Sequence, residues 1–416
     1  MKTSKRGFLT FTSLILFLFI SVACVNLTYI KTFKVKTING NNKLLNEQNL
    51  LLIKGNILSY PSDGPINDMR INMAKAYILS TSKIISLDIK KDGYGVVFKN
   101  KNTIYKPKSS MTVPINIHYN LVEKSGLVKV NFQEYMGKSY SASIYNTDIT
   151  ASAKTRDLTL HRIEKYNKDY YCVFSYYKKK NNSNMLAFAR IDRNKLTILS
   201  QVEDKIKYRW ARYGIIAFDK FFIFDYSDED GKFRPSIISY DFNSKKIERN
   251  YIEKTDPLYD VFERNPNNYE KTDNFSYIKY LPEKKSIVRV KNPNNSDNYH
   301  AYIVGIKDGR LILTEDIDTG ISVGRKEKNI EHKGNKYVFI NSCGANIFLN
   351  NDKLIFYTFN NSDLNNKEDY QQHLSLNPLK KILIYGLDTR KVDYEGIIMG
   401  GLADYGSEIY ATKKMR

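Results

Sequence analysis

Short runs of alternating apolar and polar residues, separated by polar turns, fill the chain from about residue 50 to its end. Alternation with a period of two is typical of strands that cover one face, and two such runs joined by a short turn predict a β-hairpin. The hairpins that this pattern predicts cover residues 83–99, 141–153, 186–200, 236–251, 300–314 and 381–396. No long amphipathic helix is predicted, so the sequence indicates an all-β protein.

Most of the predicted hairpins follow another pair of strand-like runs, as residues 214–219 and 220–227 do. Four strands in about 50 residues is the spacing of β-propeller blades. In this repeat pattern, residues 50–413 resemble a β-propeller. The resemblance implies six to seven four-stranded units. It also implies that the first run, residues 49–58, and the last, residues 407–413, combine to complete the ring, since closure removes exposed strand edges. A β-sandwich over residues 50–150 followed by a second β domain is the alternative.

The first thirty residues follow a different pattern. Lys2, Lys5 and Arg6 precede an apolar run over residues 8–23, and Cys24 follows it. Cations before an apolar run that ends in small residues are typical of an export signal. We therefore expect residues 1–30 to be a signal peptide or membrane anchor. The Asn-rich residues 31–48 are predicted to be a polar tether, and residues 49–416 an extracytoplasmic domain at the cell membrane.

Three interpretations of this segment stay open. Ala23 and Cys24 resemble the lipobox of bacterial lipoproteins, which would make Cys24 the lipid attachment site, although Ser21 stands where an aliphatic residue is usual. Extended through residue 30, the run is long enough to cross roughly 30 Å of hydrocarbon as an uncleaved anchor. A plain secretory signal cut after Ala23 is the third interpretation. In each, the preceding cations place the N-terminus inside and the bulk of the chain outside.

Composition limits the class of partner. The apolar content of 42% supports a sizeable core and excludes wholesale disorder. The net charge of +21 is compatible with an anionic partner. For an exported protein, the nearest anions are lipid head groups and wall polymers. We therefore predict a membrane contact through the N-terminal segment, an anionic wall polymer or a protein as partner, and no nucleic acid.

Two segments are candidate sites. Lys207, Arg209, Trp210 and Arg212 interleave cations with an aromatic ring, as surfaces that stack on sugars or bases and hold anions do, although a strand with one wet face has the same pattern. Asp225, Asp228 and Asp230 precede Gly231 and resemble part of a calcium loop. An Asp/Gly turn between two strands explains this second segment without an ion.

Evidence for catalysis is weak in the sequence. The five histidines form no His-x-x-x-His pair, and the sequence contains no Gly-x-Ser-x-Gly elbow. Cys172 and Cys343 lie in apolar stretches, so we expect two buried thiols and predict neither a catalytic residue nor a cofactor. The preferred function is binding or scaffolding in the cell envelope. The alternative is a hydrolase or lyase acting on an envelope glycan, because glycosidase carboxylates leave no linear motif.

The apolar run generates a first prediction. Because it is expected to hold the chain in or at a bilayer, the protein should sediment with the membrane fraction. Fractionation followed by immunoblotting measures this, and recovery of the full-length chain in the cytosol would contradict the interpretation.

Overall fold

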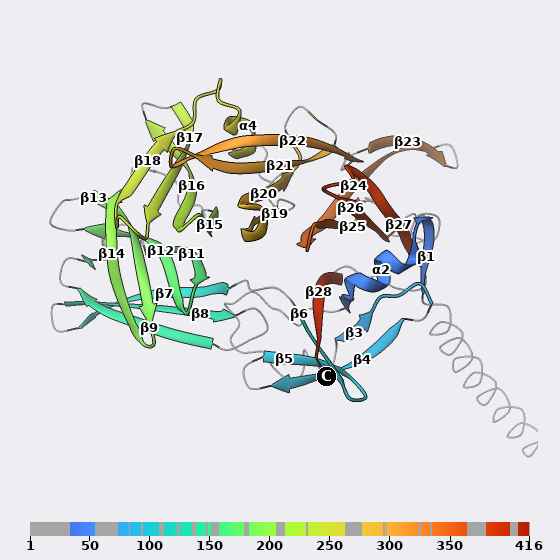
Figure 1. Ribbon diagram of the computed structural model, residues 1–416, viewed down its shortest axis with the longest axis horizontal. Coiled ribbons are helices and arrows are strands. Elements are labelled where there is room, and N and C mark those ends of the chain that lie inside the picture. The colour runs from blue at the N-terminus through green and yellow to red at the C-terminus, as the bar shows by residue number, and fades with distance from the viewer. Residues whose placement is uncertain are drawn as a thin grey trace, which may run out of the picture.

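The computed structural model of this protein describes residues 34–54, 74–82, 84–92, 95–107, 112–122, 125–134, 139–146, 149–150, 158–178, 183–204, 213–229, 232–262, 277–293, 296, 298–322, 326–332, 335–363, 380–399 and 407–415. Nearly all of these residues lie in β-strands, which confirms the predicted all-β class. The strands are arranged around a ring (Figure 1).

The described strands group into six units, numbered here along the chain. Unit 1 contains β2 (Leu50–Lys54), β3 (Lys75–Ile78), β4 (Ile85–Asp92), β5 (Gly95–Asn100), β6 (Thr103–Pro107) and β28 (Ser407–Met415), which close on one another. Unit 2 contains β7 (Thr112–Val122), β8 (Ser125–Glu134) and β9 (Ser139–Asn146). Unit 3 contains β11 (Thr159–Tyr166), β12 (Asp169–Lys178), β13 (Ser183–Asp192) and β14 (Lys195–Glu203), with β10 (Ile149–Thr150) beside β12.

The remaining units follow the same plan. Unit 4 contains β15 (Tyr213–Ala217), β16 (Lys220–Glu229), β17 (Lys232–Asp241) and β18 (Ile247–Tyr251). Unit 5 contains β19 (Tyr277–Leu281), β20 (Ser286–Lys291), β21 (Asn298–Lys307) and β22 (Arg310–Ser322). Unit 6 contains β24 (Asn335–Asn350), β25 (Lys353–Asp363), β26 (Lys380–Gly386) and β27 (Lys391–Met399), flanked by β23 (Lys326–His332) and β1 (Lys34–Gly40).

The first strands of neighbouring units contact one another around the ring. Strand β7 contacts β11, β11 contacts β15, β15 contacts β19, β19 contacts β24, and β24 contacts β28. The later strands of each unit continue outward by antiparallel pairing. The arrangement is propeller-like: units 3 to 6 are its blades, whereas unit 1 closes into a six-stranded barrel and unit 2 shares one sheet with unit 3.

The two ends of the chain meet in unit 1, as the repeat pattern predicted. Strand β2 pairs with β28 along its whole length, from Leu50 opposite Ala411 to Lys54 opposite Ser407. The Thr412 hydroxyl donates a hydrogen bond of 2.6 Å to the Asn49 carbonyl at the end of this pairing. The ring is therefore closed by residues more than 350 positions apart in sequence.

The apolar core lies between neighbouring units. One cluster joins Val173, Leu186 and Phe188 of unit 3 to Ile223 and Ile238 of unit 4. Equivalent clusters join units 2 and 3, 4 and 5, 5 and 6, and 6 and 1. Because both faces of each sheet are covered, all six positions of β20 are buried, including Arg289 and Lys291. Units 2 to 6 therefore depend on their neighbours for burial, whereas unit 1 also has a core of its own that includes Leu51, Ile53 and Phe98.

The polar tether predicted over residues 31–48 is wrong for its described part. Strand β1 pairs with β27 at the outer edge of unit 6, and α2 (Asn42–Gln48) follows, with the Asn41 side chain accepting a hydrogen bond from the Lys43 amide at its N-cap. Val35 and Leu45 are 2% and 0% exposed and pack between units 6 and 1. Val35 and Leu45 thus tie this polar segment to the core, whereas Ile38 is exposed.

Five of the six predicted hairpins form, as β4–β5, β13–β14, β17–β18, β21–β22 and β26–β27. The hairpin predicted over residues 141–153 does not. Strand β9 pairs with β8 and touches β14 through one parallel bridge, whereas β10 pairs with β12. Alternation predicts which residues of a strand share a face, but it does not predict which other strand pairs with it.

Within the described residues, no helix is long and apolar enough to cross a bilayer. Residues 1–30, which carry the export prediction and Cys24, lie outside the described residues.

Ring closure gives a prediction about stability. Leu52 of β2 is fully buried with Ile355, Ile384 and Ile409. Leu52→Ala should therefore lower the free energy of unfolding by about 2–5 kcal/mol, through lost burial and the cavity left behind. Chemical denaturation measures the change.

The control for Leu52→Ala is Ile38→Ala on β1, because Ile38 is 50% exposed. This change should stay within about 0.5 kcal/mol. Equal effects of the two substitutions would show that packing at the closure does not hold the ring together.

Candidate functional site

The tight turns that join alternate strands gather on one face of the ring, which we name the turn face. It consists of the turns at residues 166–169, 192–195, 217–220, 241–246, 281–286, 307–310, 350–353 and 386–391. Within a unit, the turn after the first strand and the turn after the third lie at the same end of an antiparallel sheet.

Contacts between units show that these ends coincide around the ring. The Tyr166 hydroxyl of unit 3 donates a 2.5 Å hydrogen bond to Asp219 of unit 4. Lys220 of unit 4 reaches the Gly309 carbonyl of unit 5 at 3.4 Å. The Asn350 amide of unit 6 donates a 2.6 Å bond to Gln48, at the end of α2 beside unit 1. The turns therefore form one continuous surface.

The turn face is rich in exposed cations. Its exposed basic residues are Lys168, Arg193, Lys195, Lys245, Lys246, Lys284, Lys285, Lys307, Arg310, Arg390 and Lys391. Its exposed acidic residues are fewer: Asp192, Asp219, Glu283, Asp308 and Asp388. The excess of positive charge is spread over units 3 to 6, so the face has a positive potential that extends over several units.

Four of these cations occupy backbone conformations that favour other residue types. Arg193, Lys245, Lys285 and Arg390 have φ values of 53°, 59°, 44° and 53°. This left-handed region favours glycine and asparagine, and a longer side chain there costs conformational energy. One such cation lies on each of units 3, 4, 5 and 6. Each of these positions thus carries a charge where the backbone conformation alone favours glycine or asparagine.

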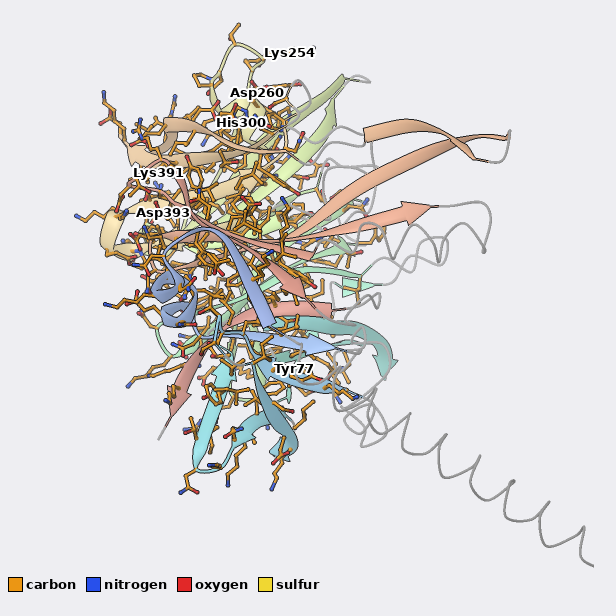
Figure 2. The ribbon with its side chains drawn as sticks, turned by 90° about the vertical axis from the view of Figure 1, so that its right-hand side faces the viewer. Tyr77, Lys254, Asp260, His300, Lys391 and Asp393 are labelled. Atoms are coloured by element: carbon orange, nitrogen blue, oxygen red, sulfur yellow. The ribbon has the colours of Figure 1, made fainter. Side chains whose placement is uncertain are left out.

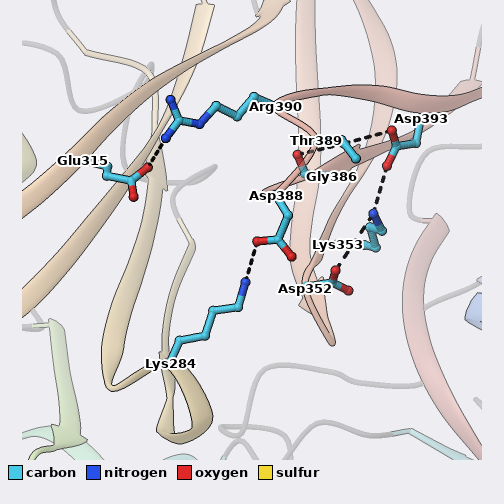
Figure 3. Close-up of polar contacts among 9 residues, drawn as sticks. All are labelled: Lys284, Glu315, Asp352, Lys353, Gly386, Asp388, Thr389, Arg390 and Asp393. Atoms are coloured by element: carbon cyan, nitrogen blue, oxygen red, sulfur yellow. Dashed lines mark hydrogen bonds and ion pairs between the residues drawn. The ribbon is translucent and has the colours of Figure 1, made fainter.

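Ion pairs align the turns of units 5 and 6 (Figure 3). Lys284 bonds Asp388 at 2.8 Å, and Arg390 bonds Glu315 at 2.8 Å. Lys284 holds the pKa of the Asp388 carboxyl below its ordinary value. Both pairs are exposed to solvent, so each contributes little to stability. The first pair joins the two turns directly, and the second joins the β26–β27 turn to strand β22.

A second network lies just below, inside unit 6 (Figure 3). Lys353 bonds Asp393 at 2.9 Å, and the Thr389 hydroxyl donates to the same carboxylate at 2.9 Å. The hydrogen bond from Lys353 to Asp393 is the main cause of a raised pKa for Lys353. In the side view Asp393 lies next to Lys391, an exposed cation of the turn face (Figure 2). The network holds the β26–β27 turn that carries Arg390 and Lys391.

Aromatic rings support the turns from within the surface. Tyr166 stacks on Phe242 at 4.6 Å, and Phe218 meets Tyr280 edge-on at 4.9 Å. Each contact joins neighbouring units. The hydrogen bond to Asp219 raises the pKa of Tyr166 to about 12, so its hydroxyl stays neutral and donates at physiological pH.

The residues predicted as a ligand strip, Lys207, Arg209, Trp210 and Arg212, lie outside the described residues, between β14 and β15. That prediction therefore stays a prediction. The cations that the structure brings together were not singled out from the sequence. A Lys or Arg next to an Asp or Asn in most of the predicted turns was the available signal, and only the fold shows that these turns share one face.

The predicted calcium segment is extended through Glu229. Asp225 and Asp228 belong to β16, opposite Ser236 and Phe233 of β17. The Asp225 side chain is 4% exposed, whereas Asp230 lies outside the described residues. Among the described residues, no group of three or more His, Cys, Asp or Glu side chains is placed to hold a metal ion. Calcium binding here stays a prediction.

On the inner strands β11, β15, β19, β24 and β28, Glu164 is the one carboxylate whose side chain is described, and it pairs with Arg162. Burial raises the pKa of Glu164. Most glycoside hydrolases use two facing carboxylates, and glycan cleavage stays an alternative prediction. Cys172 is a free, buried thiol, as expected, and burial raises its pKa above the ordinary value.

Comparison with known proteins identifies no family. No protein-family model and no curated protein matches the chain. A protein from Lactobacillus plantarum is similar in structure, with a TM-score of 0.34 and 9% identity over 82% of this chain and 81% of its own. A rhamnogalacturonan lyase has a TM-score of 0.30 and 10% identity over 78% and 72%.

A family 117 glycoside hydrolase from Zobellia galactanivorans has a TM-score of 0.26 and 10% identity, over 64% of this chain and 86% of its own. At such scores these likenesses carry no inference about activity. The propeller-like fold rests on the strand pairing of this chain itself.

The turn at residues 241–246 generates a prediction about pH. Asp241 accepts backbone hydrogen bonds of 2.9 and 2.8 Å from Asn243 and Ser244, and lies 3.4 Å from Lys220. The backbone bond from Ser244 is the main cause that lowers its pKa below the ordinary 3.8. The stabilisation is therefore complete above that unfolded-state value and is lost as the pH falls through the lower folded value.

Asp241→Asn keeps an acceptor but removes the charge. The variant should lose less stability than the wild type between pH 7 and pH 3, and denaturant titrations across this range measure both. Parallel pH profiles would show that Asp241 does not contribute to acid sensitivity.

Proposed function

We propose that this protein is a membrane-anchored, extracytoplasmic binding or scaffolding protein of the cell envelope, and that its turn face recognises an anionic wall polymer. The observation that carries the proposal is the row of exposed cations on units 3 to 6. The basic and apolar N-terminal run supports the address.

The geometry suits an extended polyanion. Lys195, Lys246, Lys307 and Lys391 are exposed, each from a different unit of one face. A polymer with a charge on every repeat can meet several such cations at once, and simultaneous weak contacts add in free energy. The aromatic and ion-pair contacts between turns hold this array on a rigid frame, which reduces the entropy lost on binding.

Substitution of the four cations that have positive φ values tests polymer binding without an expected loss of folding stability. Asparagine tolerates the left-handed conformation of Arg193, Lys245, Lys285 and Arg390. A variant with all four changed to Asn should therefore be as stable as the wild type or more stable. Its dissociation constant for poly(glycerol phosphate) should rise about fourfold or more, since each of the four exposed charges contributes roughly 0.2–1 kcal/mol. Fluorescence anisotropy at low salt, with the full chain in detergent, measures this.

The matched control removes the same number of positive charges from residues outside the turn face. Lys36, Lys90, Lys129 and Lys254 are exposed residues outside the turn face, and their joint change to Gln should alter the affinity less than twofold. Neutral dextran should not bind. Equal weakening in both variants would show that the polymer responds to net charge alone and would overturn the assignment to the turn face.

A further inference from the structure

Three polar side chains form a separate cluster in unit 5. His300 lies on β21, Asp316 on β22, and Ser296 in the connection from β20 to β21. Strands β21 and β22 lie at the outer side of the ring (Figure 1), and Figure 2 labels His300. In the ladder, Tyr302 is opposite Asp316. His300 and Asp316 are thus diagonal neighbours, which share a face of an antiparallel sheet.

The two ring nitrogens of His300 have different partners. Nδ1 lies 2.7 Å from Oδ1 of Asp316, and Nε2 lies 3.3 Å from Oγ of Ser296. An ionised carboxylate only accepts hydrogen bonds, so Nδ1 carries the proton of the neutral ring. The lone pair of Nε2 therefore faces the serine, and the Ser296 hydroxyl donates to it. This order of atoms is the one that activates a serine nucleophile.

A second contact positions the serine oxygen. The Asn298 amide N–H donates to Oγ of Ser296 at 3.0 Å. The side-chain amide of Asn298 in turn donates to both oxygens of Asp318, at 3.0 and 3.2 Å. The Gly320 amide also donates to Asp318 and is the main cause of its lowered pKa. Asp318 thus fixes Asn298, whose backbone N–H holds Oγ of Ser296 beside the imidazole of His300.

The imidazole itself is held by packing. The ring of Tyr302 stacks on that of His300 at 5.8 Å with an interplanar angle of 25°. Tyr302 is 2% exposed, and burial raises its pKa, so it stays neutral. His300 and Asp316 side chains are 17% and 46% exposed. Stacking on Tyr302 therefore orders the imidazole, while the His300 and Asp316 side chains stay in contact with solvent.

The same residue types occur in unit 3 with a different hydrogen-bond order. The Ser175 hydroxyl donates to Oδ2 of Asp204 at 2.7 Å, so Nε2 of His161 is the donor in its 2.7 Å bond to Ser175. His161 is 6% exposed. The proton of Ser175 already points to a carboxylate and the imidazole cannot accept it. This cluster is structural and provides an internal comparison.

We propose that Ser296, His300 and Asp316 form a hydrolytic site that cleaves exposed carboxylic esters. Ser296 and His300 are the catalytic residues, and Asp316 positions His300. An ester is the acyl group best suited to the site, since an alcohol leaves more readily than an amine. The solvent-facing position favours acyl groups displayed on a polymer or on a small soluble molecule.

The reaction balances without a cofactor. Oγ of Ser296 forms a bond to the carbonyl carbon while its proton passes to Nε2 of His300. The bond to the leaving oxygen then breaks, and that oxygen takes the proton from Nε2. Water attacks the acyl-serine with His300 again accepting the proton, the acid leaves, and the Ser296 hydroxyl is restored. Asp316 stabilises the imidazolium that forms in each half-reaction.

Two measurements on the full chain in detergent test this site. The first is labelling with a fluorophosphonate, in which Oγ displaces fluoride from phosphorus, followed by mass spectrometry of the peptides. The expected result is a phosphonyl group on Ser296. The second is hydrolysis of p-nitrophenyl acetate, which should fall to the background rate in Ser296→Ala and by about 100-fold or more in His300→Gln.

Ser175→Ala is the matched control, because it removes a serine from the other His–Ser–Asp cluster and should retain both labelling and hydrolysis. Labelling of the wild type needs no variant to fold. A wild type that stays unlabelled at Ser296, or a Ser296→Ala variant that hydrolyses the ester as fast as the wild type, overturns the proposal. Neither outcome bears on polymer binding by the turn face.

Discussion

Burial of apolar sheet faces between neighbouring units is the interaction on which this structure depends. Clusters of this kind join units 2 to 6 to one another and unit 6 to unit 1, and the barrel of unit 1 encloses a core of its own. Pairing of β2 with β28 completes that barrel from strands that are far apart in sequence. Helix α2 adds Leu45 to the same seam. The pairing therefore holds unit 1 beside unit 6, whose strand β24 contacts β28.

Because the apolar core holds the ring together, the turns can contain residues that do not contribute to folding. The turns contribute little to the core, which lies along the strands, so they tolerate conformational cost and charge. Arg193 and Lys245 illustrate both, since each places a cation in a conformation that asparagine or glycine would adopt more easily. The rigid array of cations follows from the core, although no cation belongs to it.

The two proposed activities occupy different parts of the ring and have different physical bases. Polymer recognition by the turn face uses many weak, screened contacts, so it is spread over four units and tolerates the loss of any one. The Ser296 cluster uses a few directed hydrogen bonds, so it is confined to a single unit and depends on the protonation of one ring, that of His300. The Ser296 cluster lies in the connection from β20 to β21, at the opposite end of the unit 5 sheet from the turns that belong to the turn face.

Period-two alternation and turn residues in the sequence determined the strands, five hairpins and the pairing of the chain ends, because these depend on local pattern and on the need to cover edges. Alternation could not choose the partner of β9, and it did not distinguish a tether from β1 and α2, where only Val35 and Leu45 mark burial. The turn face and the Ser296–His300–Asp316 cluster were decided by the tertiary structure. Both consist of residues that become neighbours only when strand register and unit order are set, and these depend on packing across the whole ring.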